Sequence, residues 1–176
     1  MGRKKFIVIL STVFIAGLVF AAMFNVGLSA TNEMSFCTSC HSMKVNLNEY
    51  KETVHYKNAS GVRATCSDCH VPRAFGPKMV AKILAYKDVV HEILGTIDTP
   101  EKYEAHRWDM ASRVWDKMKA SDSRECRSCH AWDQMNLEEQ DRIARKRHSR
   151  AATESETCID CHKGIAHTLP DEPEDI

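Results

Sequence analysis

Four copies of one short motif hold all eight cysteines of the chain. Each copy reads Cys-x-x-Cys-His. This order is typical of c-type haem attachment, because two thiols bond to the porphyrin vinyl groups and the adjacent His ligates the iron. The sequence therefore predicts four covalently bound haems. They would be held by Cys37, Cys40 and His41, by Cys66, Cys69 and His70, by Cys126, Cys129 and His130, and by Cys158, Cys161 and His162.

Two other chemistries use closely spaced cysteines. Zinc takes Cys-x-x-Cys pairs, but its His ligands usually follow at a distance of about a dozen residues. Disulfides or a redox dithiol would explain the even number of cysteines but not the His that follows each pair. Haem is thus the interpretation that accounts for every residue of the motif.

A low-spin haem needs a second axial ligand, and five histidines lie outside the motifs. His55, His148 and His167 lie between or just after motifs, and we expect them to be distal ligands. For His91 and His106 an ordinary surface role is equally consistent with the sequence. Met43 follows the first motif as Cys-x-x-Cys-His-x-Met, and its thioether is a further candidate ligand, one that would raise the reduction potential.

A run of 23 uncharged residues, from Phe6 to Leu28, follows a basic start at Arg3, Lys4 and Lys5. As a helix it would cross the roughly 30 Å hydrocarbon core of a bilayer. A cleaved secretory signal is the alternative, but its apolar stretch is usually only about 7–15 residues long. The positive-inside rule predicts a cytoplasmic N-terminus and a single-pass anchor in the inner membrane.

Residues 1–29 would then form the cytoplasmic tip and the transmembrane anchor, and residues 30–176 a periplasmic tetrahaem domain. Its expected fold is mainly α with much irregular structure, packed around four haems. The motif spacing suggests two two-haem halves, at about 30–75 and 121–168, joined by a helical insert. Helices are expected from Pro77 to Gly95, from a cap at Thr99, and from about Asn136 to Arg150. The acidic end, "DEPEDI", is expected to be disordered.

The first motif begins nine residues after Leu28, so its haem would lie close to the bilayer. A redox centre at that position suits exchange of electrons with a lipid-soluble carrier, a quinol. Quinol oxidation releases two electrons and two protons, so the site also needs groups that accept protons. The net charge of zero gives no reason to expect nucleic acid as a partner.

The sequence resembles the NapC/NirT/NrfH family of membrane-anchored tetrahaem quinol dehydrogenases, and most closely its NapC/NirT branch. Besides the N-terminal apolar run, the residues that carry the resemblance are "CTSCHSM", "HYKNASGVRATCSDCHVP", "GPKMVAKI", "GTIDTPEKYEAHR", "SDSRECRSCH" and "TCIDCHKGIAH".

The resemblance implies that Met43 rather than His41 ligates the first haem. It implies distal ligation of the third haem by His148 and of the fourth by His55, with His167 available to the second. Lys82 and Asp88 match positions implicated in the quinol site. They are six residues apart, so they cannot share one face of a straight helix; either the helix bends or ends between them, or the two touch the haem–quinol site from different sides.

The implied function is oxidation of menaquinol or ubiquinol, with electrons passed to a periplasmic reductase, nitrate reductase first of all. A donor subunit of nitrite reductase, a general electron-transfer cytochrome with no quinol site, and a terminal reductase are the alternatives. No hydrolytic or group-transfer activity is expected, and a homo-oligomer is left open.

Overall fold

The computed structural model describes residues 2–173, so the last three residues of the expected acidic tail lie outside it. The described chain is helical with irregular connections, and no strand occurs in it, as the sequence predicts. The elements are α1 (Arg3–Ala30), α2 (Met34–Cys37), α3 (Met43–Lys51), α4 (Cys66–His70), α5 (Phe75–Leu84), α6 (Tyr86–Ile93), α7 (Pro100–Ala120), α8 (Arg124–Arg127), two 3₁₀ turns η1 (Trp132–Gln134) and η2 (Leu137–Glu139), α9 (Arg142–Glu154) and α10 (Cys158–Cys161).

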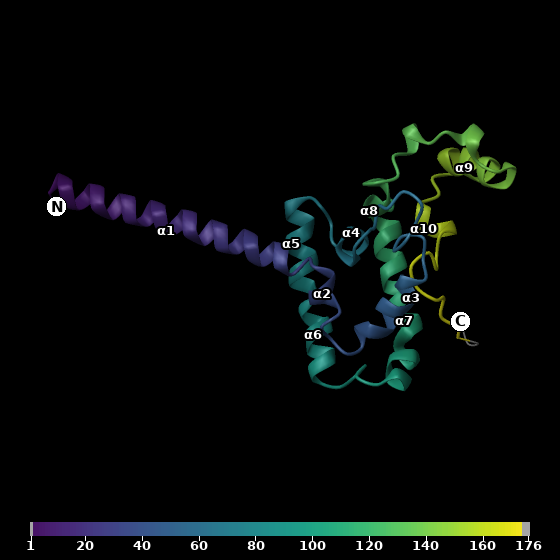
Figure 1. The fold of residues 1–176 in the computed structure, drawn as a ribbon, viewed down its shortest axis with the longest axis horizontal. Helices are drawn as coiled ribbons and strands as arrows, with labels where there is room; N and C mark the ends of the chain where they lie inside the picture. The colour runs from purple at the N-terminus through teal and green to yellow at the C-terminus, as the bar shows by residue number, and fades with distance from the viewer. Residues whose placement is uncertain (1, 174–176) are drawn as a thin grey trace.

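Helix α1 projects away from the rest of the chain as a single long rod (Figure 1). None of its side chains is buried, and its apolar residues are exposed along its whole length. It is long and apolar enough to cross a membrane. An exposed helix of this composition is unfavourable in water, so it fits a single-pass membrane anchor.

The helix expected from Pro77 to Gly95 is two helices, α5 and α6, which meet at Ala85. The first begins two residues before Pro77, at Phe75, and the second ends at Ile93. Gly95 closes the segment with a φ of 66°, a left-handed conformation that glycine adopts without strain. The break lies between Lys82 and Asp88, which is one of the two arrangements expected from their spacing.

Helix α7 begins as the sequence predicts. The Thr99 hydroxyl accepts a hydrogen bond from the backbone N–H of Lys102 at 3.3 Å, and Pro100 occupies the first turn. Trp108, Ala111, Trp115 and Met118 recur at helical spacing along α7 and are half-buried. Helix α7 packs against α10, so it connects the middle of the chain to the fourth motif.

The third expected helix starts later than predicted. Residues 136–140 form a 3₁₀ turn and a bend, and α9 begins only at Arg142. The carboxylate of Asp141 accepts hydrogen bonds from the N–H groups of Ile143 and Ala144, at 2.8 and 3.0 Å. This side-chain cap ends the preceding irregular segment, and the prediction of a start near Asn136 overlooked it.

The buried hydrophobic side chains of the described residues are only Tyr50, Ile97, Tyr103 and Ile159. The described residues thus provide only a small aliphatic core, and specific polar contacts also join distant segments. The Arg107 guanidinium, 8% exposed, donates to Glu49 Oε1 at 2.6 Å and to the carbonyl of Thr168 at 3.1 Å. This cluster joins α3, α7 and the C-terminal segment.

Candidate functional site

The four motifs adjoin one another in chain order. Helix α2, which ends at the first motif's Cys37, packs against α4, and α4 packs against α8. The third and fourth motifs are joined by the Ser123 hydroxyl, which accepts a hydrogen bond from the backbone N–H of Ile159 at 3.1 Å. Ser123 is fully buried. The fold therefore arranges the motifs as a continuous series.

The second and fourth motifs share a local signal that sequence reasoning missed. Thr65 and Asp68 form a capping box around the start of α4, and Thr157 and Asp160 form one around the start of α10. Each Thr precedes the first Cys of its motif and each Asp stands between the two cysteines. The pattern Thr-Cys-x-Asp-Cys-His thus fixes a helical turn that places both thiols about one turn apart.

Three imidazole pairs are the central geometric feature of the structure. In each pair a motif His faces a His from outside the motifs, with ring centroids about 6 Å apart. The pairs are His55 with His130 at 6.1 Å, His70 with His167 at 6.3 Å, and His148 with His162 at 6.0 Å.

That separation suits a metal between the rings. Two metal–nitrogen bonds of about 2 Å, together with roughly 1 Å from each nitrogen to its ring centre, give a separation of about 6 Å. Two of the histidines from outside the motifs also have a buried ring nitrogen without a hydrogen-bond partner. These nitrogens are Nδ1 of His55 and Nδ1 of His167. Burial lowers the pKa of both imidazoles, which favours the neutral form that binds metals.

The pairing differs from one expectation. The resemblance implied His148 for the third haem and His55 for the fourth. The structure places His55 opposite His130 of the third motif and His148 opposite His162 of the fourth, which points to the opposite assignment. His167 lies opposite His70 of the second motif, where the sequence suggested it could serve.

The two remaining histidines from outside the motifs do not belong to these pairs. His91 and His106 are exposed; His91 lies 3.3 Å from the Thr96 hydroxyl and His106 lies 2.8 Å from the carbonyl of Lys102. All eight cysteines are free of disulfides. The described residues contain no cluster of three or more Cys, His, Asp or Glu side chains that could hold a metal ion.

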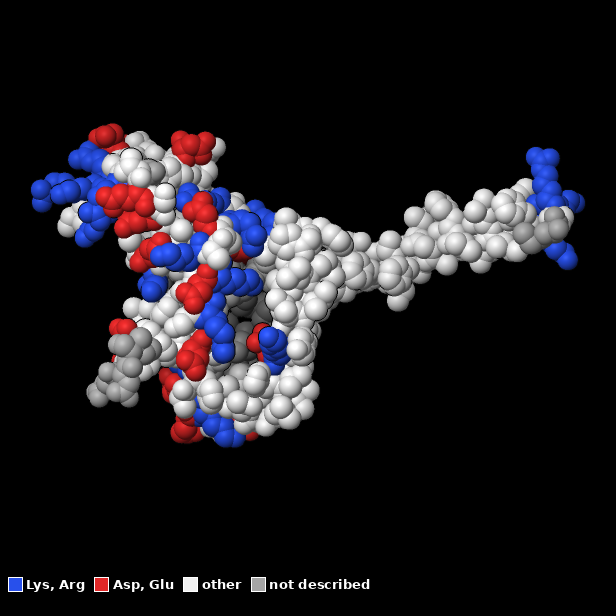
Figure 2. All heavy atoms as spheres, turned by 180° about the vertical axis from the view of Figure 1, so that it is seen from behind, with Lys and Arg blue, Asp and Glu red and all other residues white. Residues whose placement is uncertain are grey.

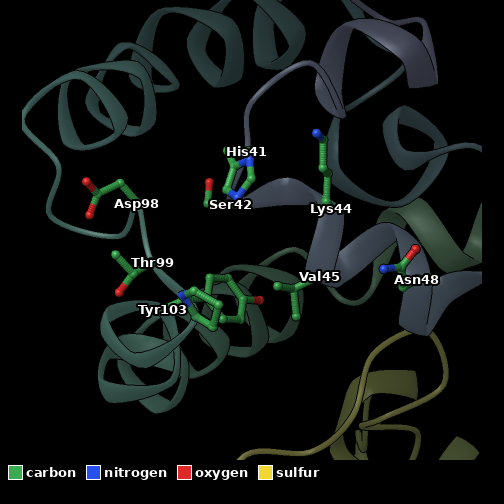
Figure 3. Close-up of a pocket in the computed structure, with 9 residues that line it drawn as sticks. His41, Ser42, Lys44, Val45, Asn48, Asp98, Thr99 and Tyr103 are labelled. Carbon is green, nitrogen blue, oxygen red and sulfur yellow. The ribbon is translucent and has the colours of Figure 1, made fainter.

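The first motif has another environment. His41 lines a pocket of about 110 Å³ and faces Asp98, Thr99 and Tyr103 rather than a second imidazole (Figure 3). Met43, two residues on, begins α3, and its sulfur lies 3.8 Å from the Asn46 amide nitrogen. Ligation of the first haem by Met43 rather than His41 stays a prediction.

Glu92 of α6 holds the turn between His41 and Met43, a role that the sequence did not reveal. Its carboxylate accepts hydrogen bonds from the backbone N–H of His41 at 3.0 Å and from the hydroxyl of Ser42 at 2.6 Å. Ser42 is buried. The first motif is thereby fixed to the helical segment that also carries Lys82 and Asp88.

Lys82 lies at the point where α1 ends. Its ammonium donates a hydrogen bond to the Thr31 hydroxyl, just after α1, at 2.7 Å. Burial, with a smaller contribution from Lys78, lowers the pKa of Lys82. A lysine with a lowered pKa exchanges protons more readily near neutral pH.

Asp88 lies on the next helix and has different neighbours. Its surroundings partly desolvate the carboxylate and raise its pKa, against the opposing effect of Arg113 on α7. The residue as a whole remains exposed, so part of the carboxylate is open to solvent. The structure thus brings Lys82 to the end of α1 and Asp88 to the side of α6 near α7.

Paired Cys-x-x-Cys-His helices and facing imidazoles define a multihaem c-type cytochrome. A family model described as the NapC/NirT cytochrome c family, N-terminal region, matches residues 1–172. The chain belongs to this family.

Several similar proteins match this sequence along most of its length. A putative tetraheme cytochrome-c type protein of Allochromatium vinosum is 57% identical over 175 residues, which are 99% of this chain and 95% of the relative. NapC of Escherichia coli K12 is 51% identical, over 90% of this chain and 80% of the relative. The denitrification system component NirT of Stutzerimonas stutzeri is 55% identical, over 89% and 79%. No solved structure matches the chain significantly.

Membership and geometry together support covalently bound haem c and a role in electron transfer. The cysteine pairs would attach the porphyrins, and the three imidazole pairs would supply axial nitrogens at the second, third and fourth sites.

Proposed function

We propose that this protein is a membrane-bound quinol dehydrogenase that passes electrons from menaquinol or ubiquinol to a periplasmic reductase, with nitrate reductase as the first candidate. The observation that carries the proposal is the 2.7 Å hydrogen bond from Lys82 Nζ to the Thr31 hydroxyl. It holds an ionisable side chain of the haem domain where α1 leaves the membrane. A lipid-soluble reactant reaches that point without entering the aqueous phase.

Quinol oxidation releases two protons for each pair of electrons, so the site must accept protons. The pKa of Lys82 is lowered and that of Asp88 is raised, in both cases chiefly by desolvation. Both shifts move these groups toward the pH range in which they exchange protons. Lys82 would bind the quinol oxygen, and Asp88 would receive a proton or pass it to solvent.

When bound, the four haems supply one-electron redox centres whose potentials depend on their axial ligands. The chain's own contribution is to place them in series. Helix α2 adjoins the end of α1, and the contacts from α2 to α4, from α4 to α8, and from Ser123 to Ile159 follow the motifs to the fourth. His148, which faces the fourth motif's His162, belongs to α9.

Helix α9 is the proposed exit toward the reductase. Its outer side carries Arg142, Lys146 and Arg147, which are exposed. Figure 2 shows charged side chains gathered on the part of the body remote from α1. A basic surface beside the last imidazole pair would attract an acidic surface on the acceptor. Relatives named NapC and NirT make nitrate reductase the first acceptor to test.

The orientation of the chain in the membrane is part of the same proposal. Arg3, Lys4 and Lys5 precede α1, so the positive-inside rule would keep the N-terminus in the cytoplasm. Residues 30–176 would then form the haem domain in the periplasm, and α1 would anchor it in the bacterial inner membrane. The division into halves at 30–75 and 121–168 also remains a prediction, and two imidazole pairs join one half to the other.

The experiment reconstitutes the full chain in lipid vesicles with menaquinol and adds purified reductases one at a time. We expect nitrate reduction to require both the quinol and this chain. Nitrite reductase as the better acceptor would favour the donor-subunit alternative. Turnover of nitrate or nitrite without any added reductase would indicate a terminal reductase. Haems that are reduced by dithionite but not by the quinol would indicate an electron carrier without a quinol site.

A further inference from the structure

Helices α5 and α6 turn their apolar sides outward. We define their apolar face as Val80, Ile83, Leu84, Tyr86, Ile93 and Leu94, each of which is more than half exposed. In a helix on the surface of a water-soluble domain, such residues face the interior and charged residues face the solvent. Here, in contrast, large apolar residues of both helices are exposed.

Two of their charged side chains face the protein instead. Lys82 of α5 donates to the Thr31 hydroxyl, and Glu92 of α6 accepts from Ser42 and from the backbone of His41. Both charged residues are at least half-buried. The inward side is thus engaged with the end of α1 and with the first motif, and the outward side has no contact that would explain its composition.

The position of this surface relative to α1 indicates what covers it. The uncharged run from Phe6 to Leu28 measures about 35 Å as a helix, slightly more than the roughly 30 Å hydrocarbon core. Thr31 therefore lies near the lipid head groups. The hydrogen bond from Lys82 to Thr31 places α5 at the same depth.

The orientation of α5 and α6 also agrees with a position at the membrane surface. Figure 1 shows α5 and α6 following each other across the inner end of α1, so that a membrane perpendicular to α1 would run along them. In Figure 2 the uncharged surface of α1 continues onto the side of the body from which α1 departs, whereas the charged side chains gather on the remote side. The apolar face is thus continuous with the surface of the membrane anchor.

We propose that α5 and α6 lie in the interfacial layer of the bilayer, with their apolar face in contact with lipid acyl chains. An amphipathic helix whose polar side remains bound to protein or water and whose apolar side enters the head-group boundary is stable in that layer. Tyr86 suits the interface, where amphipathic aromatic rings are enriched, and Lys87 can extend its ammonium to lipid phosphates. The chain would thus be held to the membrane by two attachments, α1 and this helix pair. The proposal requires α1 to be a membrane anchor and does not depend on the quinol activity.

Site-specific photo-cross-linking in the full-length holoprotein tests the proposal. The photoreactive residue p-benzoylphenylalanine is placed at Ile83 in a protein that is reconstituted in phospholipid nanodiscs. The positive control is Val13, inside α1. The negative control is Ile143 on α9, an isoleucine that is 69% exposed, against 62% for Ile83. Intact mass confirms four haems in each variant before irradiation.

We expect lipid adducts at Ile83 at a yield near that of Val13 and at least about tenfold above that of Ile143, as for a residue in contact with acyl chains. A yield at Ile83 no higher than at Ile143 would overturn the proposal, and so would a cross-link to a second copy of the chain or to a co-reconstituted reductase as the main product. The same measurement at Ile93, on α6, provides a second site if the Ile83 variant fails to mature.

Discussion

The imidazole rings of His55 and His130 face each other at a centroid distance of 6.1 Å, with their planes at 80°. The other two pairs are closer to parallel, at 36° for His70 with His167 and 31° for His148 with His162. One imidazole pair, that of His55 with the third motif's His130, is therefore distinguishable from the others by its orientation alone.

Replacement of His55 tests the assignment. Near-perpendicular axial rings leave two iron d orbitals close in energy and give a strongly anisotropic low-spin EPR signal. We expect His55→Met to remove that signal and to raise the potential of one haem, because Met/His ligation raises the potential. His148→Met is the matched control and should instead remove a rhombic signal. Persistence of the anisotropic signal in His55→Met would contradict the pairing.

Lys82 is expected to serve quinol oxidation without affecting haem attachment. In Lys82→Gln, stopped-flow reduction of the haems by a menaquinol analogue should slow by roughly ten- to a hundredfold, since a positioned proton-transfer group contributes at least that much. Reduction by dithionite should not change. Lys87→Gln, an exposed lysine of the next helix, controls for loss of charge. Equal rates for Lys82→Gln and wild type would remove Lys82 from the site.

The proposed exit on α9 predicts a salt-dependent interaction with the acceptor. Reversal of charge in the double variant Lys146→Glu, Arg147→Glu should raise the KM for the reductase and weaken the dependence of the rate on ionic strength. Quinol-driven reduction of the haems should stay normal, because α9 lies far from α1 (Figure 1). Lys51→Glu on α3 is the control. A KM that does not change would place the docking surface elsewhere.

The Arg107 cluster is expected to stabilise the haem domain. Arg107 and Glu49 are joined at 2.6 Å, with side chains 10% and 18% exposed. Arg107→Met would leave the half-buried Glu49 carboxylate without its charged partner and with the Thr168 N–H as a remaining donor, so the free energy of unfolding should fall by about 3 kcal/mol. Arg150→Met, which removes an exposed pair with Glu154, should change it by less than about 1 kcal/mol. Guanidinium unfolding of the detergent-solubilised holoprotein measures both values, and equal losses would contradict a special role for the buried cluster.

Local patterns in the sequence predicted much of this structure. The Cys-x-x-Cys-His motifs, the apolar run of α1, and the Thr99 cap each involve residues within a few positions of one another. The break at Ala85 was one of the two arrangements expected from the six-residue spacing of Lys82 and Asp88. Such features follow from the period of the helix and from capping, which act over short stretches of chain.

Contacts between distant residues could not be predicted in this way. His55 and His130 are 75 positions apart, and Glu92 holds Ser42 across 50. Their meeting depends on how the motifs pack, for which a single sequence carries no periodic signal. The start of α9 was a different failure, because Asp141 is a local cap that could have been recognised.

The most direct test of the proposed function is an equilibrium titration of the full-length protein in nanodiscs with menaquinol, followed by the haem absorption bands. The account predicts that the quinol reduces the haems of the wild-type protein and that added oxidised nitrate reductase with nitrate reoxidises them. Haems that dithionite reduces fully but menaquinol leaves oxidised would contradict it.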